Sequence, residues 1–276
     1  MSTDAPPPAA PIAARPIAPF ANPPAGPLAG PLAGKVALVT GAARRVGAAI
    51  VRSFHAAGAG VIVHYHHSAA AAAALVADLE SRRPDSAASI GADLLATAQL
   101  GDLVNFATGR FGRLDILVNN ASTFYPTPVG DITETHWDDL LGSNLKAPLF
   151  LSQAAAPALR RAEGQILNIV DIHGMRPLRN YPVYGVAKAG LIMLTRALAR
   201  ELAPQVRVNA IAPGPVMWPA DGLADDALQQ KIVERTLLKR SGSAEDIART
   251  ALFFAAEAPF ITGQIMPVDG GRSVAW

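Results

Sequence analysis

The sequence contains no cysteine, which excludes disulfide bridges and thiol catalysis and fits a reducing compartment. It also lacks any run of about 18 or more apolar residues, so no membrane span is expected although half of the chain is apolar. An excess of one charge is missing too, because 24 basic and 22 acidic residues leave a net charge of only +2. With no dense basic tract, nucleic-acid binding is not indicated. We therefore expect a cytoplasmic protein that binds neither membranes nor nucleic acid.

The first 34 residues differ in composition from the rest of the chain. They are rich in Pro, Ala and Gly and end in the repeat Gly-Pro-Leu-Ala-Gly-Pro-Leu-Ala-Gly. Such a segment buries too little apolar surface to offset the entropy of ordering. Its prolines interrupt the apolar core that a signal peptide needs, and a transit peptide would be richer in Arg and Ser. We predict a disordered tail over residues 1–34 and one folded domain over residues 35–276.

Beyond the tail, short apolar segments alternate with segments that suit helices. Strands are expected at Val36–Thr40, Val61–Tyr65, Ala88–Gly91, Asp115–Asn119, Gln165–Val170, Val206–Ile211 and Gln264–Val268. Helices are expected at Ala48–Ala57, Ala69–Ser81, Ala96–Phe111, Thr133–Leu159 and Tyr184–Leu202. Fully apolar strands separated by helices indicate a parallel sheet that is covered on both faces. We predict an α/β fold, a single doubly wound domain with a seven-stranded parallel sheet.

A glycine-containing turn follows the first strand and leads directly into the first helix. Its sequence is Gly41-Ala-Ala-Arg-Arg-Val-Gly47. At such a helix start, backbone N–H groups and the helix dipole bind the pyrophosphate of a dinucleotide, and glycine permits its close approach. Arg45 stands where the usual pattern has a middle glycine. A turn that merely needs two glycines is the alternative interpretation.

The end of the second strand bears on which dinucleotide is bound. A NAD-selective site places an acidic residue there, but this chain has none between Val61 and Ala77. The side chains that could instead bind a ribose 2′-phosphate are Arg45, His64, His66, His67 and Ser68. The sequence thus favours NADP(H). A metal cluster of the three histidines is the alternative, without cysteines or carboxylates at ligand spacing to support it.

The segment after the third strand, Gly91-Ala-Asp-Leu94, leaves two interpretations open. Asp93 could contact the adenine of the cofactor, with Leu94 beside it. It could equally cap the helix that follows.

Tyr184 and Lys188 are four residues apart, which places them on one face of a helix. An ammonium beside a phenol favours the phenolate and lowers a pKa of about 10 toward neutrality, where proton transfer is useful. Pro182 suits a helix start, so Tyr184 should lie in the first turn. The alternative is an ordinary Tyr/Lys pair on a solvated helix face.

Taken together, Thr40-Gly41 with Gly47, Asn119-Asn-Ala121, Asn144 and the Tyr184/Lys188 pair resemble the short-chain dehydrogenase/reductase superfamily. The resemblance extends from about Val36 to Ser273 and implies a Rossmann-type domain. In such a domain Tyr184 is the proton donor, Lys188 holds the nicotinamide ribose and lowers the tyrosine pKa, and Asn144 holds a water of the proton relay. Asn120 and the backbone after it border the cofactor.

The same resemblance has implications for the later part of the chain. The segment Ile211-Ala-Pro-Gly-Pro215 should touch the nicotinamide, and residues 217–238 should form a mobile cover over the substrate. Helices over Asn144–Ala158 and Tyr184–Leu202 should form subunit contacts, with a homotetramer expected.

Within the superfamily, the chain is most similar to pteridine reductases. Asp171 stands where the superfamily usually has a serine thirteen residues before the tyrosine, and both His64-Tyr-His-His-Ser68 and Asn119-Asn-Ala-Ser-Thr-Phe-Tyr-Pro-Thr-Pro128 match this narrower family. His67 departs from it, because an arginine is usual there. The resemblance implies a pterin stacked between Phe124 and the nicotinamide. Asp171 could otherwise be a solvated carboxylate at a strand end, and Phe124 an ordinary core aromatic.

We accordingly predict an NADPH-dependent pteridine reductase that transfers a hydride to the C=N bond of a dihydropterin, with oxidised pterins and folates as further candidate substrates. The alternatives are a general carbonyl or 3-oxoacyl reductase of the same superfamily and a non-catalytic NADP-binding regulatory protein. No metal is expected. The predicted catalytic residues are Asp171, Tyr184, Lys188 and Asn144, and the predicted substrate contacts are Arg45, Phe124, Asp171 and Tyr184. The predicted cofactor contacts are Gly41, Arg44, Arg45, Val46, Gly47, His64, His66, His67, Ser68, Asp93, Leu94, Asn120, Ala121, Ser122, Lys188, Pro213 and Gly214.

Overall fold

The structure is a computed structural model that describes residues 30–216 and 226–275. Its strands form one parallel sheet in the order β3-β2-β1-β4-β5-β6-β7. The seven-stranded parallel sheet that the sequence predicts is thereby confirmed. The strands are β1 Val36–Val39, β2 Gly60–Tyr65, β3 Ala87–Gly91, β4 Ile116–Asn119, β5 Gln165–Ile169, β6 Arg207–Pro213 and β7 Ile265–Val268.

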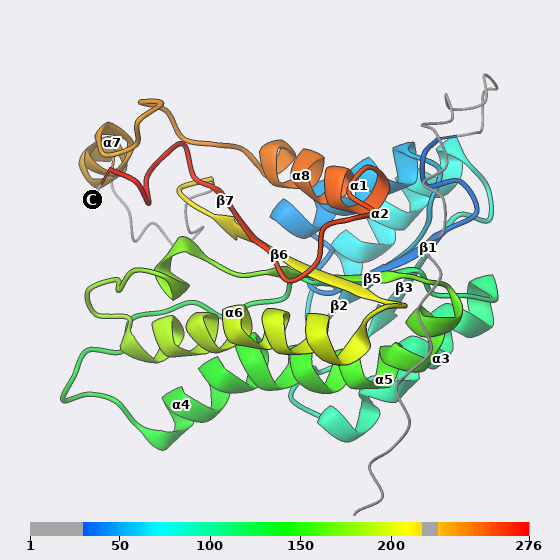
Figure 1. Cartoon of the computed structure of the whole chain (residues 1–276), viewed down its shortest axis with the longest axis horizontal. Coiled ribbons are helices and arrows are strands. Elements are labelled where there is room, and N and C mark those ends of the chain that lie inside the picture. The colour runs from blue at the N-terminus through cyan, green and yellow to red at the C-terminus, as the bar shows by residue number, and fades with distance from the viewer. Residues whose placement is uncertain (1–29, 217–225, 276) are drawn as a thin grey trace, which may run out of the picture.

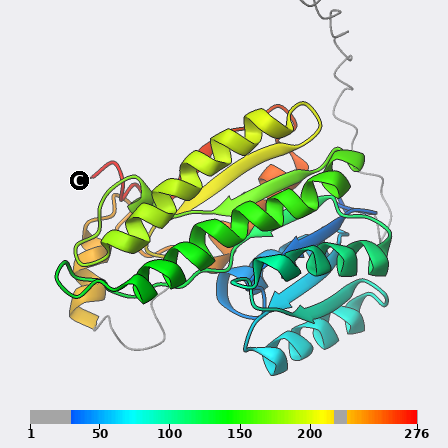
Figure 2. The same ribbon diagram turned by 90° about the horizontal axis from the view of Figure 1, so that it is seen from below.

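Helices cover both faces of the sheet (Figures 1 and 2). One face is covered by α1 Arg45–Ala56, α2 Ala69–Arg82 and α8 Ala244–Ala256, whose apolar residues share a core cluster with β1 and β2. The other face is covered by α3 Leu100–Phe111, α5 Ala147–Arg161 and α6 Pro182–Leu202. The Rossmann-type architecture is confirmed, but α8 was not predicted. Its start carries a clear signal, because Ser243 and Asp246 form a capping box.

The order of the strands determines where a ligand can bind. β1 pairs with β2 on one side and with β4 on the other, so the chain changes direction across the sheet between these strands. In doubly wound folds the crevice at the carboxyl ends of such strands is the ligand site. The turn after β1 and the segment after β4 both lie at this edge, which brings Gly41 and Asn120 together.

The helix predicted over Thr133–Leu159 is interrupted in the structure. It consists of α4 Glu134–Leu141, the π-helical turn η2 Gly142–Lys146 and then α5. Asn144 lies in η2 and is completely buried. A π-helical turn adds one residue to the helix and is often found at functional sites.

The first described residues belong to the fold rather than to a tail. Leu32 is completely buried against the core, and its backbone N–H donates to the carbonyl of Ala57 at 2.9 Å. A side chain at Gly30 would lie 2.2 Å from the same carbonyl oxygen. The boundary predicted after Gly34 is therefore too late, and the folded part begins by Gly30. The rest of the predicted tail, residues 1–29, lies outside the described residues.

Residues 217–225 of the predicted substrate cover also lie outside the described residues. The described remainder of the cover consists of the short helix α7 Asp226–Glu234 and the turn to Leu238. The 3-10 turns η1 Thr97–Gln99 and η3 Ile172–Gly174 complete the elements. Within residues 30–216 and 226–275, no helix has the length and apolarity to span a bilayer.

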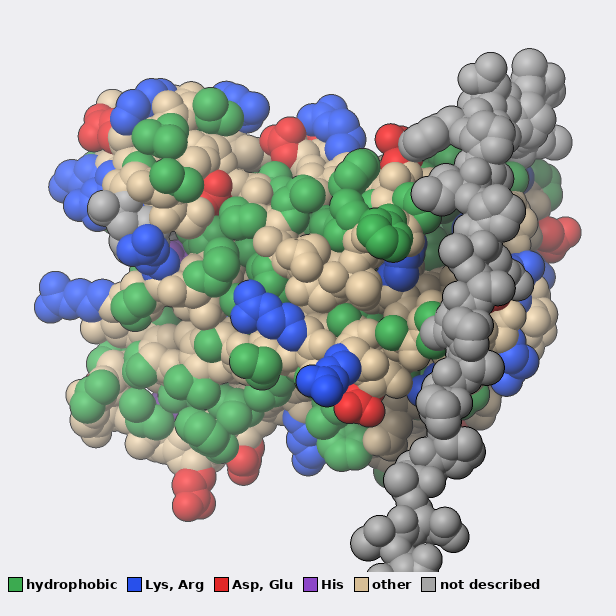
Figure 3. All heavy atoms as spheres, in the orientation of Figure 1, with side chains coloured by type: hydrophobic (Ala, Val, Ile, Leu, Met, Phe, Trp, Pro, Cys, Tyr) green, Lys and Arg blue, Asp and Glu red, His purple; other side chains and the backbone are tan. Residues whose placement is uncertain are grey.

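Apolar side chains reach the surface on the helices that were expected to form subunit contacts. Leu149 and Phe150 on α5 and Val186 and Met193 on α6 are between 37% and 61% exposed. Figure 3 shows such side chains on the face that carries α4 and α6. A subunit contact would cover a surface of this kind, but the homotetramer stays a prediction.

Candidate active site

Tyr184, Asp171 and Lys188 are brought together at the carboxyl end of β5. The Tyr184 hydroxyl donates to Asp171 Oδ2 at 2.8 Å. The other carboxylate oxygen accepts the backbone N–H of His173 at 2.7 Å, which orients the carboxylate. Lys188, one helical turn after Tyr184 on α6, is buried and donates from Nζ to the carbonyl of Ile169 at 3.0 Å. Asp171 is thus partly buried and hydrogen-bonded to the tyrosine, and it is not a freely solvated carboxylate at a strand end.

The electrostatics of this group differ from the sequence-based expectation. Burial raises the pKa of the Tyr184 phenol well above its ordinary value, and the Asp171 carboxylate raises it further. The Nζ of Lys188 lies over the ring of Tyr184, 5.6 Å from its centroid. Burial lowers the pKa of Lys188 itself to about 8, although Asp171 opposes this change. The net change in the pKa of Tyr184 is therefore upward, opposite to the direction expected from the sequence, and the phenol is protonated at neutral pH.

Asn144 is held rigidly by hydrogen bonds within the protein. Its Nδ2 donates to the carbonyl of Leu140 at 2.9 Å and to that of Thr123 at 3.0 Å. Its Oδ1 accepts the Ser122 hydroxyl at 2.6 Å. Ser122 also lowers the pKa of the Tyr184 phenol, although burial and Asp171 act more strongly in the opposite direction. The hydrogen-bonding groups of Asn144 are thus all used within the protein, and its role in a proton relay stays a prediction.

Phe124 is exposed beside Tyr184 and is not a core aromatic. Its side chain is 39% exposed, its ring stacks on Tyr181 at 4.5 Å between centroids, and its edge-to-face contact with Tyr184 measures 4.8 Å. Its position is fixed by its neighbours in the sequence, because Thr123 hydrogen-bonds Ser143 at 2.5 Å. Tyr181 was not predicted as a neighbour of this site. Its spacing of three residues from Tyr184 was the signal that could have found it.

The turn after β1 is closely packed against the segment after β4. The Thr40 hydroxyl accepts the backbone N–H groups of Asn120 and Ala121 at 2.9 and 3.0 Å. The Asn120 amide donates to the carbonyls of Thr40 and Gly41. A side chain at Gly47 would lie 2.5 Å from the Gly41 carbonyl oxygen, so only glycine fits there. The side chain of Asn120 consequently braces the turn, which opens onto the N-terminus of α1.

The residues between the two glycines occupy different environments. Arg45 has a φ of +55°, a left-handed conformation that explains why glycine is usual at this position. Arg44 and Arg45 are exposed, whereas the Val46 side chain packs against the core and only its backbone faces the turn. The turn between Gly41 and Gly47, which we call the glycine cradle, and the start of α1 therefore fit a bound pyrophosphate.

His64 has a structural position rather than the predicted contact with a phosphate. It is 1% exposed, its Nδ1 accepts the Gly41 N–H at 3.1 Å, and its Nε2 lies 3.1 Å from the Ala92 carbonyl oxygen. Both ring nitrogens are occupied by the backbone, so neither is available to a ribose phosphate. Burial also lowers the pKa of His64 to about 4, which keeps the ring neutral. The prediction for His64 is corrected accordingly.

The other predicted contacts of the adenosine end lie on two neighbouring strand ends. His66 and His67 are exposed after β2, and Ser68 occupies the N-cap position of α2. Asp93 accepts the backbone N–H of Leu95 at 2.9 Å, so it caps a turn and not a helix. Leu94 is buried in the core cluster under α3. Among the described residues, no three His, Asp or Glu side chains are grouped as metal ligands.

The end of β6 closes the other side of the site. Pro213 is the last residue of the strand, and the Gly214 N–H donates to the Val268 carbonyl at 3.0 Å. A side chain at Gly214 would lie 2.5 Å from the Cβ of Asp269, so the loop needs glycine to pass the end of β7. Because β6 pairs with β5, this loop lies next to Asp171.

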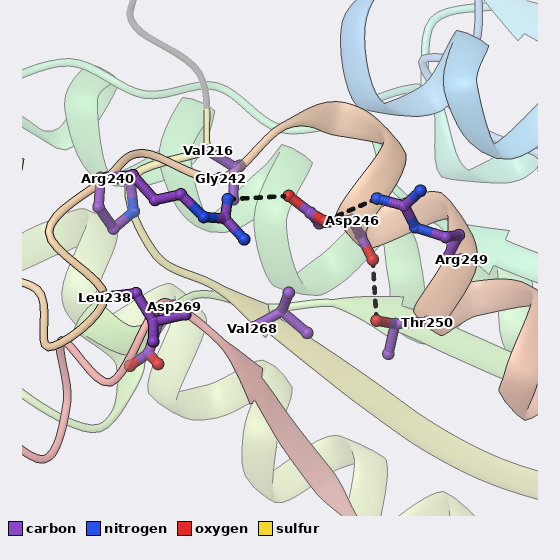
Figure 4. Close-up of a pocket in the computed structure, with 11 residues that line it drawn as sticks. Val216, Leu238, Arg240, Gly242, Asp246, Arg249, Thr250, Val268 and Asp269 are labelled. Carbon is purple, nitrogen blue, oxygen red and sulfur yellow. Dashed lines mark hydrogen bonds and ion pairs between the residues drawn. The ribbon is translucent and has the colours of Figure 1, made fainter.

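A cavity of about 300 Å³ lies beyond β6, between the first turns of α8 and the end of β7. Figure 4 shows Arg240 and Arg249 turned toward Asp246 from its two sides, at 3.9 and 2.8 Å. These charges are paired with one another. Apart from its position beside the Gly214 loop, the cavity contains none of the predicted site residues.

Comparison with known proteins identifies the family of this site. A family model described as enoyl-(acyl carrier protein) reductase matches residues 41–273. The chain is 40% identical to pteridine reductase 1 of Leishmania tarentolae, over 87% of this chain and 96% of that protein. It is 35% identical to the 3-oxoacyl-(acyl-carrier-protein) reductase FabG of Staphylococcus epidermidis, over 86% of this chain and 98% of that protein. These matches and the geometry of the site agree that the chain belongs to the short-chain dehydrogenase/reductase family and is an oxidoreductase.

Proposed function

We propose that the protein is an NADPH-dependent pteridine reductase. The observation that carries this proposal is the 2.8 Å hydrogen bond from the Tyr184 hydroxyl to Asp171, next to the exposed ring of Phe124. A carboxylate beside the proton donor suits a substrate that accepts a proton on nitrogen. It does not suit one that develops an alkoxide, because two adjacent negative charges repel each other.

The described residues fit a bound dinucleotide. The glycine cradle at Gly41 and Gly47 and the start of α1 would hold the pyrophosphate. The exposed His66, His67 and Arg45 would bind the ribose 2′-phosphate, which favours NADPH. The buried Lys188 would hold the nicotinamide ribose. Bound in this way, the cofactor supplies the hydride, and the protein supplies binding, orientation and the proton.

Side chains of the protein bind the pterin ring and supply the proton. Phe124 provides a flat apolar surface on which a pterin ring can stack. Tyr184 donates its hydroxyl proton to the ring nitrogen, and its raised pKa ensures that the proton is present at neutral pH. Asp171, which is partly exposed, then passes a proton from solvent back to the phenolate.

Reduction of 3-oxoacyl esters is the competing activity, since a relative with that name covers most of the chain. The deciding experiment measures NADPH oxidation with dihydrobiopterin and, separately, with an acetoacetyl ester. We expect oxidation with the pterin, and its loss in Tyr184→Phe. Oxidation with the ester alone would overturn the proposal.

A further inference from the structure

We propose that Tyr181 is a positioning residue that holds the ring of Phe124 in the orientation on which the substrate stacks. The proposal rests on the proposed function, in which Phe124 provides the flat surface for a pterin ring. Tyr181 is neither a predicted substrate contact nor a predicted cofactor contact. It acts on the substrate only through Phe124.

Phe124 lies on a segment that does not by itself fix the direction of the side chain. Residues 120–128 form neither helix nor strand, and the side chain of Phe124 is 39% exposed. Exposed side chains change rotamers rapidly unless a neighbour packs against them. A substrate that must first order a mobile ring binds more weakly, because the rotamer freedom of that ring is lost on binding. An effective stacking surface at Phe124 therefore needs a second group that restrains the ring.

The ring of Tyr181 provides this restraint. It lies nearly parallel to the ring of Phe124, with 4.5 Å between the centroids and 12° between the planes. Tyr181 thus covers one face of Phe124, and a substrate that stacks on Phe124 uses the face that Tyr181 leaves open. The ring of Tyr184 contacts Phe124 at 4.8 Å and 77°. A restrained Phe124 consequently keeps the stacked substrate beside the proposed proton donor.

Tyr181 is itself held at the start of α6. It is the N-cap residue of this helix, and its carbonyl accepts the backbone N–H of Gly185 at 2.9 Å. Pro182 follows it, and a proline restricts the backbone conformation of the residue before it. The side chain of Tyr181 also packs against the buried cluster that includes Tyr184. Tyr181 is therefore a firmer support than the segment that carries Phe124.

A backbone hydrogen bond joins the two segments but does not orient the rings. The N–H of Thr127, which is completely buried, donates to the carbonyl of Asn180 at 2.6 Å. Asn180 has a φ of +67°, a left-handed conformation that asparagine adopts more readily than most residues. This bond keeps the backbones near Phe124 and Tyr181 together. The rotamer of Phe124 still depends on the stacking of the two rings.

A double-mutant cycle of Tyr181→Leu and Phe124→Ala tests this role. Leucine removes the ring and keeps the side chain apolar. For Tyr181→Leu we expect KM for dihydrobiopterin to rise roughly fivefold, with the Kd for NADPH within about twofold of the wild type. The kcat should also stay within about twofold, because the bound substrate selects the same orientation of Phe124. In the Phe124→Ala protein, Tyr181→Leu should change KM by less than about twofold, since the ring that it positions is absent.

Two variants serve as controls. Tyr181→Phe keeps the ring and should restore KM to within about twofold of the wild type. Tyr125→Leu makes the same substitution next to Phe124, at a tyrosine whose hydroxyl donates to Asp139 on α4 at 2.9 Å. It should leave KM within about twofold of the wild type. If Tyr181→Leu does not fold, Tyr181→Met serves in its place.

Several results would overturn the role of Tyr181. One is an unchanged KM in Tyr181→Leu, and another is a rise in KM that Tyr181→Phe does not reverse or that Tyr125→Leu reproduces. A rise that persists in the Phe124→Ala protein would mean that Tyr181 acts on the substrate independently of Phe124.

The failure of this role is distinguishable from the failure of the proposed function. A wild-type protein that does not oxidise NADPH with dihydrobiopterin would overturn the proposed function, and the role of Tyr181 with it. A wild-type protein that is active with dihydrobiopterin, combined with additive effects in the cycle, would overturn the role of Tyr181 alone.

Discussion

The Tyr184 hydroxyl donates to Asp171 Oδ2 at 2.8 Å, although the two residues come from a helix and a strand end thirteen positions apart. Burial and the carboxylate together raise the pKa of the phenol well above its ordinary value. The pair therefore holds a proton firmly until a substrate accepts it. In the proposed function, this arrangement is the reason for preferring a C=N bond to a ketone as the substrate.

Replacing Asp171 with serine, the usual residue of the family at this position, should change the substrate preference. We expect kcat/KM for dihydrobiopterin to fall about a hundredfold, because the proton donor loses its partner. The activity on an acetoacetyl ester should rise, since the developing alkoxide no longer faces a carboxylate. Both values are measured by NADPH oxidation, and an equal fall in both would contradict the assigned role.

The charge of Lys188 should make NADPH binding depend on pH. Burial lowers its pKa to about 8, so the ammonium is present below that pH and is lost above it. The Kd for NADPH, measured by fluorescence, should increase as the pH rises through 8. In Asp171→Asn the carboxylate no longer raises the lysine pKa, so the transition should move to lower pH. A transition at the same pH in both proteins would show that Lys188 does not control it.

Shortening Phe124 to alanine should weaken substrate binding more than cofactor binding. Stacking of a flat heterocycle on an aromatic ring contributes ~1–3 kcal/mol, so KM for the pterin should rise about tenfold. The Kd for NADPH should change less than twofold. Phe260 is fully exposed on the turn after α8 and provides the control, because Phe260→Ala removes an aromatic ring from elsewhere on the surface. Equal changes in both binding constants would argue against stacking.

His64 should make the fold sensitive to acid. Its pKa is about 4 in the folded protein, against an ordinary value of 6.5, because the ring is buried. The stability it contributes is thus fully present above pH 6.5 and is lost as the pH falls toward 4. Between pH 7 and pH 5 this amounts to about 2 kcal/mol in the free energy of unfolding.

Urea unfolding at these two pH values measures the effect. His64→Gln cannot titrate and should lose about 2 kcal/mol less than the wild type on acidification. His67→Gln, a change at an exposed histidine, should follow the wild type. If His64→Gln and the wild type lose the same stability, the buried imidazole is not the group responsible.

Two truncations should show where the folded part of the chain begins. A chain that begins at Gly30 keeps Leu32 and should retain the stability of the full chain. A chain that begins at Lys35 loses Leu32, which is completely buried, and should be less stable by roughly 2–5 kcal/mol. Thermal and urea unfolding measure the stability of both truncated chains, and Leu32→Ala in the full chain is the control. Equal stability of the two truncations would mean that Leu32 contributes nothing.

The sequence by itself determined the features that depend on neighbouring residues. Apolar segments such as Val61–Tyr65 and the glycines of the first turn predict strands, their parallel arrangement and the ligand-binding edge, because periodicity and turn chemistry are local. The four-residue spacing of Tyr184 and Lys188 places both on one helix face, as the structure shows. The capping box of α8 could also have been predicted from the sequence. The burial of Leu32 was harder to predict, because this residue lies in a Pro/Ala/Gly repeat that is typical of a disordered tail.

Only the tertiary structure decided the properties that depend on distant partners. The imidazole of His64 is neutral because the fold encloses it between Gly41 and Ala92. Tyr184 keeps its proton because burial and the Asp171 carboxylate raise the pKa of the phenol. Desolvation and hydrogen bonding act on whichever groups the fold brings together, and these come from separate segments of the chain. No local pattern can therefore specify the pKa values on which the chemistry of this site depends.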